Sequence, residues 1–264
     1  MKIGIIGGGN MGGSIARGLV RSGFMPASDI AVSSPRNVTL DALSADCPGL
    51  QVSTDNSTVV QVADVIILAV KPWLIGKVLD EIAPRVAFRE QIIVSLAAGV
   101  SLSDIDAMLH RYSSSRTLFR AIPNTAMLVG SSMTFLCSDN ATPQQVDMVK
   151  SIFDALGTAA VIDERLMGAA TALCSCGIAY AMRYVRAATE GGVELGIYPH
   201  KAKEYVLATL RGAVELLEAT GNNPEVEIDK VTTPGGITIK GLNAMEAHGF
   251  TTAVIEGLKA SSNG

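Results

Sequence analysis

The apolar residues in the first part of the chain form short, nearly continuous runs, each followed by small or turn-forming residues. The clearest runs span residues 3–6, 64–70, 92–96 and 118–122. Runs of this length without polar alternation are typical of strands buried on both faces, as in a parallel sheet. Residues with helical spacing lie between them. The pattern therefore predicts alternating strands and helices in this part of the chain.

Three further strands are expected at residues 29–34, 133–137 and 159–162. Before the last of them, Thr142-Pro143-Gln144-Gln145 predicts a helix start. This segment combines an N-cap threonine, a proline at the first helical position and a glutamine at the third. We expect Gly157 to end that helix.

The pattern changes after residue 162. Residues 165–199 show no strand signal and are rich in alanine, glycine, cysteine and serine, which predicts a long helix that other helices can approach closely. Pro199 opens a second helix, whose apolar stripe consists of Ala202, Val206, Leu210, Val214 and Leu217. Gly221 ends this helix.

The remaining residues predict a loop over residues 222–236, followed by two short helices divided by Gly249. We therefore divide the chain into an α/β domain, residues 1–162, and an all-helical domain, residues 163–264.

The first predicted strand ends in Gly7-Gly8-Gly9-Asn10-Met11-Gly12, and a helical pattern follows. This segment fits G-x-G-x-x-G, in which Gly7 permits the tight turn, Gly9 lets the backbone approach a pyrophosphate and Gly12 lets helix and strand pack closely. Glycine-rich turns are common, so a plain structural turn is the alternative. The position between a strand and a helix favours a dinucleotide-binding domain with a Rossmann-type doubly wound sheet.

The end of the second strand favours NADPH over NADH. An NAD-binding site normally has an aspartate or glutamate here, about 20 residues after the glycines, that bonds the adenine ribose. This chain has Ser33, Ser34, Pro35 and Arg36 instead. Hydroxyl groups and a cation suit a 2′-phosphate, which an acid would repel. A polar loop with an incidental arginine is the alternative, and NADH remains possible.

The other candidate cofactor contacts come from segments expected at the carboxyl edge of the sheet, where ligands of open α/β folds bind. Asn56 opens a short helix that ends near Ala63. The remaining candidates lie at the ends of predicted strands or directly after them and are Ala69, Val70, Lys71, Pro72, Ala97, Ala98, Gly99, Pro123 and Asn124.

The composition of the 264 residues predicts a subunit interface. Hydrophobic residues make up 48% and charged residues 17%, which is more apolar surface than one small core can hide. We therefore expect the helical domain to form a homodimer. The net charge of −4 gives no basic footprint for nucleic acid or an anionic membrane. The longest charge-free run, residues 121–138, contains Pro123, Asn124 and serines, so we do not expect it to span a membrane.

The cysteines and the chain start predict a reduced, cytoplasmic protein without a metal site. Cys47, Cys137, Cys174 and Cys176 lack the spacing of zinc ligands. Cys174 and Cys176 lie two apart on an expected helix and point to different faces, so they favour neither a metal pair nor a disulfide. We expect no signal peptide before the first strand.

Several segments resemble the pyrroline-5-carboxylate reductase family, which catalyses the last step of proline biosynthesis. They cover nearly the whole chain in order, and the Pro-Gly-Gly-x-Thr segment is specific. The matching segments are residues 7–12, 69–72, 97–100, 120–125, 191–193, 233–238, 249–250 and 253–256.

The resemblance implies that the chain uses NAD(P)H to reduce 1-pyrroline-5-carboxylate to L-proline. It also implies a Rossmann domain followed by an interlocked helical dimerisation domain, with dimers often assembled into decamers. The expected fold is thus an N-terminal Rossmann-type doubly wound sheet followed by an all-helical dimerisation domain, which would also bind substrate.

Departures from the family pattern leave the substrate open. The chain has Cys174-Ser175-Cys176-Gly177-Ile178-Ala179-Tyr180 where the family has Ser-Gly-Ser-Gly-Pro-Ala-Tyr. Ala126 stands where the family usually has proline, and Ile237 where many members have threonine. Because the first of these segments lies near the substrate pocket in relatives, another cyclic imine or a 2-oxo acid is an alternative substrate. A non-catalytic NADP-binding protein that regulates a partner is a third alternative.

The residues suit the reduction of an imine. A protonated imine is already electrophilic, so its reduction needs no strong general acid, and residues 166–199 contain neither lysine nor histidine. The segment Thr233-Pro234-Gly235-Gly236-Ile237-Thr238 precedes a predicted helix, so its N–H groups and hydroxyls can bind a substrate carboxylate. A helix-capping turn is the alternative. With the resemblance, we expect Thr233, Gly235, Gly236 and Thr238 to bind substrate, and Thr238 to bond the imine nitrogen as the catalytic residue.

Overall fold

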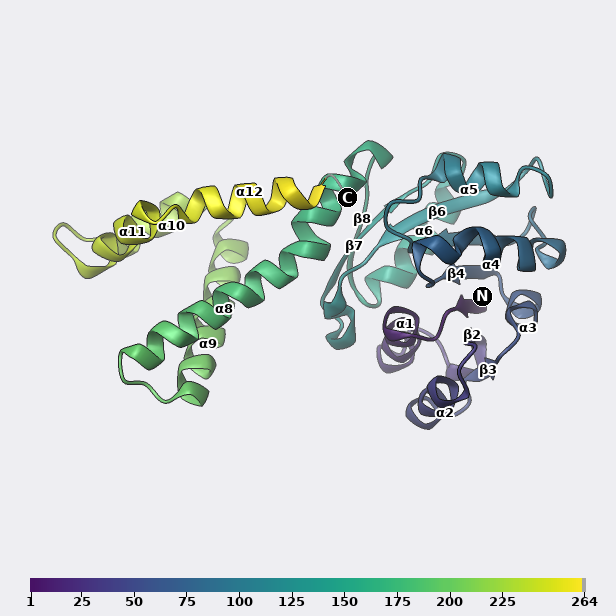
Figure 1. The fold of residues 1–264 in the computed structure, drawn as a ribbon, viewed down its shortest axis with the longest axis horizontal. Coiled ribbons are helices and arrows are strands. Elements are labelled where there is room, and N and C mark those ends of the chain that lie inside the picture. Colours follow the sequence, from purple (N-terminus) through teal and green to yellow (C-terminus); the bar gives the residue numbers. More distant parts are fainter. Residues whose placement is uncertain (263–264) are drawn as a thin grey trace. The chain divides into compact units, whose positions relative to one another are not determined.

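The computed structural model describes residues 1–262, which fall into two compact units (Figure 1). The first unit comprises Met1–Ser175, and the second begins at Cys176. Our division of the chain after residue 162 stays a prediction.

The first unit is built on an eight-stranded sheet with the order β3-β2-β1-β4-β5-β6-β7-β8. Neighbouring strands are parallel except for β6 and β7, which are antiparallel. The predicted doubly wound α/β fold is confirmed. The strands are β1 (Ile3–Ile6), β2 (Ile30–Ser33), β3 (Gln51–Ser53), β4 (Val65–Leu68), β5 (Ile92–Ser95), β6 (Thr117–Ile122), β7 (Ser132–Cys137) and β8 (Gly157–Val161).

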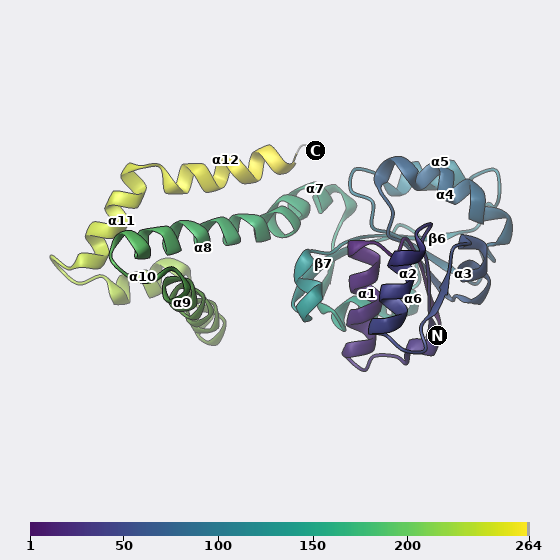
Figure 2. The same cartoon turned by 60° about the horizontal axis from the view of Figure 1, so that its bottom comes forward.

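Helices cover both faces of this sheet. On one face, α1 (Asn10–Arg21), α2 (Asn37–Asp46) and α6 (Pro143–Asp154) contribute to one apolar core; Figure 2 shows these three helices together. On the other face, α3 (Asn56–Val62), α4 (Ile75–Ile82) and α5 (Leu102–Leu109) contribute to a second core. Successive strand residues alternate between the two, so Ile5 lies in the first core and Ile6 in the second. Most strand positions are therefore apolar.

The predicted start of α6 is confirmed, whereas its predicted end is wrong. Thr142 and Gln145 form a capping box, with a proline in the first turn. The helix ends at Asp154, and Gly157 is the first residue of β8, with φ of +147°. A Cβ atom on Gly157 would lie 2.1 Å from the carbonyl oxygen of Ser132. This glycine therefore permits close strand pairing instead of ending a helix.

Every regular element in the described part of the second unit is a helix, as predicted. Its helices are α8 (Gly177–Glu194), α9 (Pro199–Thr220), α10 (Pro224–Val231), α11 (Ile237–Ala247) and α12 (Phe250–Ser262). Gly221, with φ of +63°, ends α9, and Gly249, with φ of +77°, separates the last two helices. The predicted loop over residues 222–236 is wrong in part, because α10 lies within it. Asn223 caps this helix and Pro224 occupies its first position.

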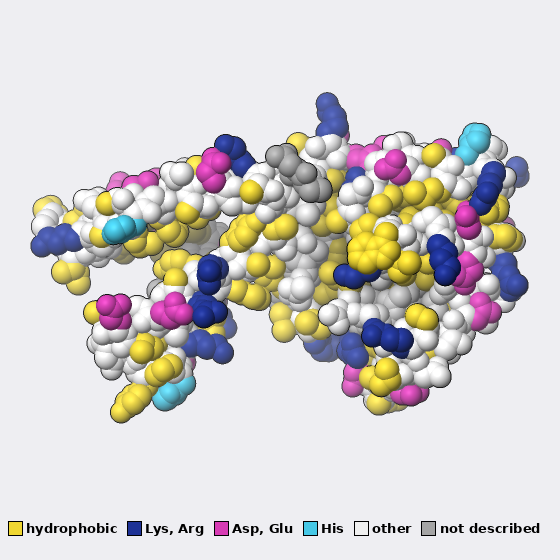
Figure 3. Space-filling model, viewed as in Figure 1, with side chains coloured by type: hydrophobic (Ala, Val, Ile, Leu, Met, Phe, Trp, Pro, Cys, Tyr) yellow, Lys and Arg dark blue, Asp and Glu magenta, His cyan; other side chains and the backbone are white. Residues whose placement is uncertain are grey.

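Much of the second unit's apolar surface is exposed, as the yellow side chains over α8 and α12 in Figure 3 illustrate. An apolar groove of about 690 Å³ runs along this unit and is lined in part by Tyr180, Tyr184, Met245, Phe250 and Val254. Exposed apolar surface on this scale marks a contact with another molecule.

One helical stretch among residues 1–262, Glu164–Glu194, is long and apolar enough to cross a membrane by length and composition alone. It includes α7 (Met167–Ala170), the π-helical segment Thr171–Cys176 and α8. A helix that packs against a protein partner has the same length and composition.

Candidate functional site

The glycine turn after β1 has the close contacts that a dinucleotide fingerprint requires. Gly7 has φ of +105°, and a Cβ atom there would lie 2.6 Å from the carbonyl oxygen of Ala69. A Cβ atom on Gly12 would lie 2.1 Å from the carbonyl oxygen of Gly7. A larger residue at either position would force the backbone apart.

Gly9 is different, because no described atom outside its own chain neighbours lies within 4 Å of where its Cβ would be. It is the N-cap of α1 and provides no side-chain bond to the helix end. The N–H groups of Asn10, Met11 and Gly12, the first residues of α1, therefore lack intrahelical partners. Open space beside such a helix end fits a pyrophosphate. The residues present at this turn thus fit a bound dinucleotide.

Ser33, at the end of β2, connects this turn to a second predicted contact. Its carbonyl oxygen accepts hydrogen bonds from the N–H groups of Gly7 and Gly8, both at 2.9 Å. Its hydroxyl donates to Oδ1 of Asn56 at 2.6 Å. Ser33 is fully buried, so it holds the glycine turn and Asn56 in place through hydrogen bonds in the protein interior.

The other two residues of this loop differ in exposure. Ser34 is buried, and its hydroxyl accepts a hydrogen bond from the N–H of Arg36 at 3.4 Å. Arg36 is exposed and is the N-cap of α2. Its guanidinium is therefore free to meet an anion from solvent, as the NADPH prediction requires.

Glu81 is a residue at this site that the sequence analysis missed. Asn56 is half-buried at the first position of α3, and its Nδ2 donates to Oε1 of Glu81 at 3.0 Å. Glu81 lies near the end of α4, 25 positions further along the chain. The residues around Glu81 show an ordinary amphipathic helical pattern, in which an exposed glutamate gives no signal for a contact with Asn56.

The segment after β4 lies directly beside the glycine turn. Ala69 donates its N–H to the carbonyl oxygen of Ile6 at 2.8 Å. A side-chain carbon of Val70 would lie 3.0 Å from a Cβ on Gly7. Lys71 is exposed and caps the 3₁₀ helix η2 (Pro72–Leu74). The side chain of Trp73 follows and is 77% exposed.

The segment after β5 also consists of small residues at the carboxyl edge. Ala97 is buried and donates its N–H to Oγ of Ser95 at 3.3 Å. Ala98 and Gly99 are exposed, and Gly99 has φ of +74°. Ser101 then caps α5 through Asp104, whose pKa is lowered by its hydrogen bonds from the Ser101 side chain and backbone.

Pro123 and Asn124, at the end of β6, are both buried. The side chain of Asn124 accepts a hydrogen bond from the N–H of Ala126 at 3.0 Å and donates to the carbonyl oxygen of Cys174 at 3.5 Å. Asn124 thus connects the strand end to the π-helical segment Thr171–Cys176. The roles of Pro123 and Asn124 in cofactor binding stay predictions.

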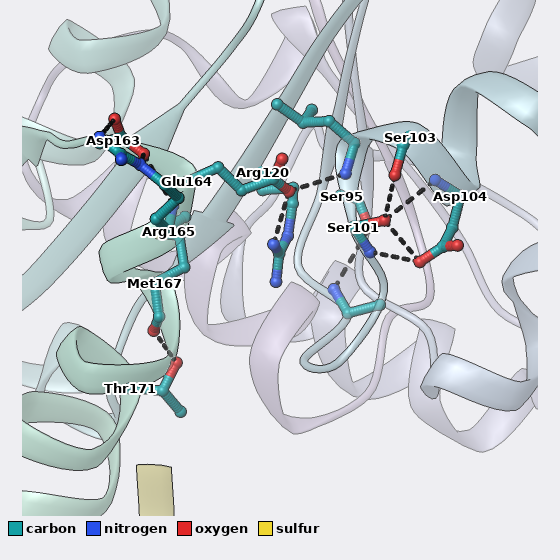
Figure 4. Close-up of polar contacts among 12 residues, drawn as sticks. Ser95, Ser101, Ser103, Asp104, Arg120, Asp163, Glu164, Arg165, Met167 and Thr171 are labelled. Atoms are coloured by element: carbon teal, nitrogen blue, oxygen red, sulfur yellow. Dashed lines mark hydrogen bonds and ion pairs between the residues drawn. The ribbon is translucent and has the colours of Figure 1, made fainter. Parts of the chain in front are cut away.

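An ion pair between a buried arginine and a half-buried glutamate supports the β5 and β6 side of this edge (Figure 4). Arg120 is 8% exposed, and its Nη1 lies 2.7 Å from Oε1 of Glu164. The same carboxylate oxygen accepts the N–H of Leu102, the first residue of α5, at 2.8 Å. Neighbouring Cys137 lies on β7, where burial first, and then the charge of Glu164, raises its pKa to about 11.

The predicted substrate turn lies in the second unit, whereas the predicted cofactor residues lie in the first. Gly235 has φ of +73°, and Gly236 donates its N–H to the carbonyl oxygen of Thr233 at 2.9 Å. Gly236 is the N-cap of α11, so Ile237 and Thr238 occupy the first turn of that helix. Thr238 is exposed. The structure therefore brings this turn together at a helix N-terminus, which suits a carboxylate.

The four cysteines are free thiols. Among residues 1–262, no group of three or more histidine, cysteine, aspartate or glutamate side chains is arranged to hold a metal ion.

Two family models match the chain. Residues 164–264 match the model described as pyrroline-5-carboxylate reductase dimerisation, and residues 2–99 match the model described as NADP oxidoreductase, coenzyme F420-dependent.

Full-length relatives match as well. The pyrroline-5-carboxylate reductase of Synechocystis is 34% identical over 99% of this chain and 96% of its own length. Pyrroline-5-carboxylate reductase 1 of Dictyostelium discoideum is 37% identical over 99% of this chain, which spans 48% of that relative. The crystal structure of Plasmodium falciparum pyrroline carboxylate reductase with NADP bound is 27% identical. Its TM-score is 0.89, and the match covers 100% of this chain and 96% of that one.

Proposed function

The chain belongs to the pyrroline-5-carboxylate reductase family, and we propose that it reduces 1-pyrroline-5-carboxylate to L-proline with NADPH as the hydride donor. It is an NAD(P)H-dependent oxidoreductase of this family. The observation that carries the proposal is the open space beside Gly9 at the N-terminus of α1, which fits a pyrophosphate. The family match extends over nearly all residues of the chain.

The residues of the first unit would bind and orient the cofactor. The N–H groups at the start of α1 would hold the pyrophosphate, and Arg36 would bind the 2′-phosphate. When bound, the reduced nicotinamide supplies the hydride. The segment from Ala97 to Gly99 presents small side chains and a left-handed glycine, which leave room for the ring at the carboxyl edge.

The residues of the second unit would orient the substrate. The free N–H groups at the start of α11 would bind the carboxylate of the imine. The Thr238 hydroxyl would hydrogen-bond the nitrogen of the protonated imine, which orients the ring for hydride transfer. The hydride adds to the imine carbon and the nitrogen keeps its proton, which completes the reduction to the amine.

The described helices of the second unit would form the interface of an oligomer. The family model that covers residues 164–264 is a dimerisation model, and the apolar groove beside Tyr180 provides surface to cover. We expect a homodimer, with a decamer as the alternative, larger assembly. The free thiols are compatible with the proposed location in the reducing cytoplasm.

A second candidate function follows from the cysteine-containing segment around Cys174. Its residues differ from the family pattern, and Asn124 contacts this segment. The alternative substrates are therefore another cyclic imine or a 2-oxo acid. A non-catalytic NADP-binding regulator is a third candidate.

One assay separates these functions. Purified full-length protein is mixed with NADPH and 1-pyrroline-5-carboxylate, and the loss of NADPH absorbance is followed. Turnover with this substrate supports the proposal. Turnover with other imines or 2-oxo acids alone supports the second candidate, and NADPH binding without turnover of any of them supports the third.

A further inference from the structure

Two side chains on opposite sides of Asn56 hold its amide in one orientation. Glu81 accepts a hydrogen bond from Nδ2 at 3.0 Å, and Ser33 donates one to Oδ1 at 2.6 Å. An ionised carboxylate can only accept hydrogen bonds, so Glu81 determines which end of the amide is the NH₂ group. The two bonds therefore work together to prevent a flip of the Asn56 amide.

The same network reaches the glycine turn. The carbonyl oxygen of Ser33 accepts the N–H groups of Gly7 and Gly8, while its single hydroxyl hydrogen is used on Asn56. Asn56 retains a second hydrogen on Nδ2 after its bond to Glu81. In a Rossmann-type site, residues at the carboxyl end of the second strand lie beside the adenine ribose. Asn56 is bonded to Ser33 at this strand end, so its remaining Nδ2 hydrogen can be donated to the ribose or to its 2′-phosphate.

We propose that Glu81 is a positioning residue that orients Asn56 for the cofactor, and that its negative charge reduces the preference for NADPH over NADH. This inference rests on the proposed function, in which the first unit binds the cofactor. Glu81 places a carboxylate against the amide of Asn56, whereas Arg36 is an exposed cation at the start of α2, directly after β2. A 2′-phosphate is repelled by the first and attracted by the second, whereas NADH, which has none, is unaffected by both.

Three variants test the two parts of the proposal. Glu81→Gln removes the charge but retains an oxygen that can accept from Asn56. Glu81→Ala removes both the charge and the acceptor. Asp80→Asn is the matched control, because it neutralises the neighbouring carboxylate on α4, which pairs with Arg111 at the protein surface instead of contacting Asn56.

Two readouts are needed for each variant. The first is the KM for NADPH and for NADH, with kcat, in the imine reduction assay. The second is the dissociation constant of each cofactor without substrate, followed by quenching of Trp73, the single tryptophan of the chain. Trp73 is exposed beside the candidate cofactor segment Lys71-Pro72, so its emission is a suitable probe.

For Glu81→Gln, we expect the ratio of KM for NADH to KM for NADPH to rise about threefold to tenfold, because one repulsive charge is lost. For Glu81→Ala, we expect the dissociation constants of both cofactors to rise by roughly threefold to tenfold, because Asn56 loses its anchor. The value of kcat should stay within about twofold of wild type, since the nicotinamide end is held by other residues. Asp80→Asn should leave every constant unchanged.

Equal shifts of the KM ratio in Glu81→Gln and Asp80→Asn would overturn the charge effect. The ratio would then respond to the loss of either carboxylate on α4 and not specifically to the loss of Glu81. Unchanged dissociation constants in Glu81→Ala would overturn the positioning role. If the wild-type chain bound neither NADPH nor NADH, the proposed function itself would fail. If the wild type bound cofactor and the Glu81 variants bound it equally well, only the positioning role would fail.

Discussion

Arg120 and Glu164 form a largely buried ion pair, with 2.7 Å between Nη1 and Oε1. Glu164 also accepts the N–H of Leu102, so one carboxylate joins β6, the start of α5 and the 3₁₀ helix η5 (Glu164–Leu166). Nε of Arg120 has no hydrogen-bond partner among residues 1–262. Arg120 therefore depends on Glu164 to compensate for the burial of its charge.

Removal of Glu164 should destabilise the first unit strongly. Glu164→Ala leaves a buried cation and the N–H of Leu102 without their acceptor, which costs about 3 kcal/mol of unfolding free energy. Urea unfolding measures this loss. The neighbouring Asp163→Ala is the control, because Asp163 pairs with the exposed Arg165 at the surface, where ion pairs contribute little. Equal losses in the two variants would contradict the special role of Glu164.

The sequence predicted the parts of the fold that local patterns determine. Apolar runs identified strands such as β4, within predicted residues 64–70, because both faces of the sheet are buried. Thr142 and Gln145 identified a helix start because a capping box is formed by residues three positions apart. The glycine turn was identified because its spacing reflects contacts that the structure contains at Gly7 and Gly12.

Contacts between distant residues could not be predicted in this way. Arg120 and Glu164 are 44 positions apart, and Asn56 and Glu81 are 25 apart, so no periodicity connects them. The antiparallel pairing of β7 depends on the path of the chain after β6. Helix α10 was missed because its few residues show little apolar periodicity, and none of them is buried in the described structure.

The glycines of the fingerprint should separate folding from cofactor binding. Gly12→Ala should destabilise the protein, because its Cβ would lie 2.1 Å from the carbonyl oxygen of Gly7. Gly9→Ala should fold normally, because its Cβ would point into open space and its φ is −67°. It should nevertheless weaken NADPH binding by at least about tenfold by filling the space proposed for the pyrophosphate. Thermal unfolding and NADPH titration measure the two effects. Wild-type NADPH affinity in Gly9→Ala would show that the pyrophosphate does not lie there.

Arg36 should determine affinity for the 2′-phosphate. Arg36→Ala should raise the KM for NADPH by about tenfold or more, because a charged hydrogen bond contributes about 1.5–3 kcal/mol. The KM for NADH should barely change. Arg36→Lys provides a control that keeps the charge and should lose less affinity. An unchanged KM for NADPH in Arg36→Ala would show that this guanidinium does not contact the phosphate.

Cys137 should resist alkylation in the native protein. Burial raises the pKa of its thiol to about 11, so the reactive thiolate is scarce below that pH, and the side chain is also covered. At pH about 8, iodoacetamide should therefore label Cys137 only after denaturation. Mass spectrometry of peptides from native and urea-unfolded protein measures this difference. Equal labelling in both states would contradict the buried environment.

Thr238 should act in turnover and not in cofactor affinity. Thr238→Val keeps the shape of the side chain and removes the hydroxyl that we expect to bond the imine nitrogen. If that bond is stronger in the transition state, its loss of about 1.5–3 kcal/mol lowers turnover roughly 10- to 150-fold. NADPH affinity should remain nearly the same, because the glycine fingerprint lies in the other unit. Thr238→Ser, which retains a hydroxyl, should keep most of the rate. Wild-type turnover in Thr238→Val would exclude a catalytic role for the hydroxyl, whereas a large loss of NADPH affinity would mean that this turn supports the cofactor instead of the substrate.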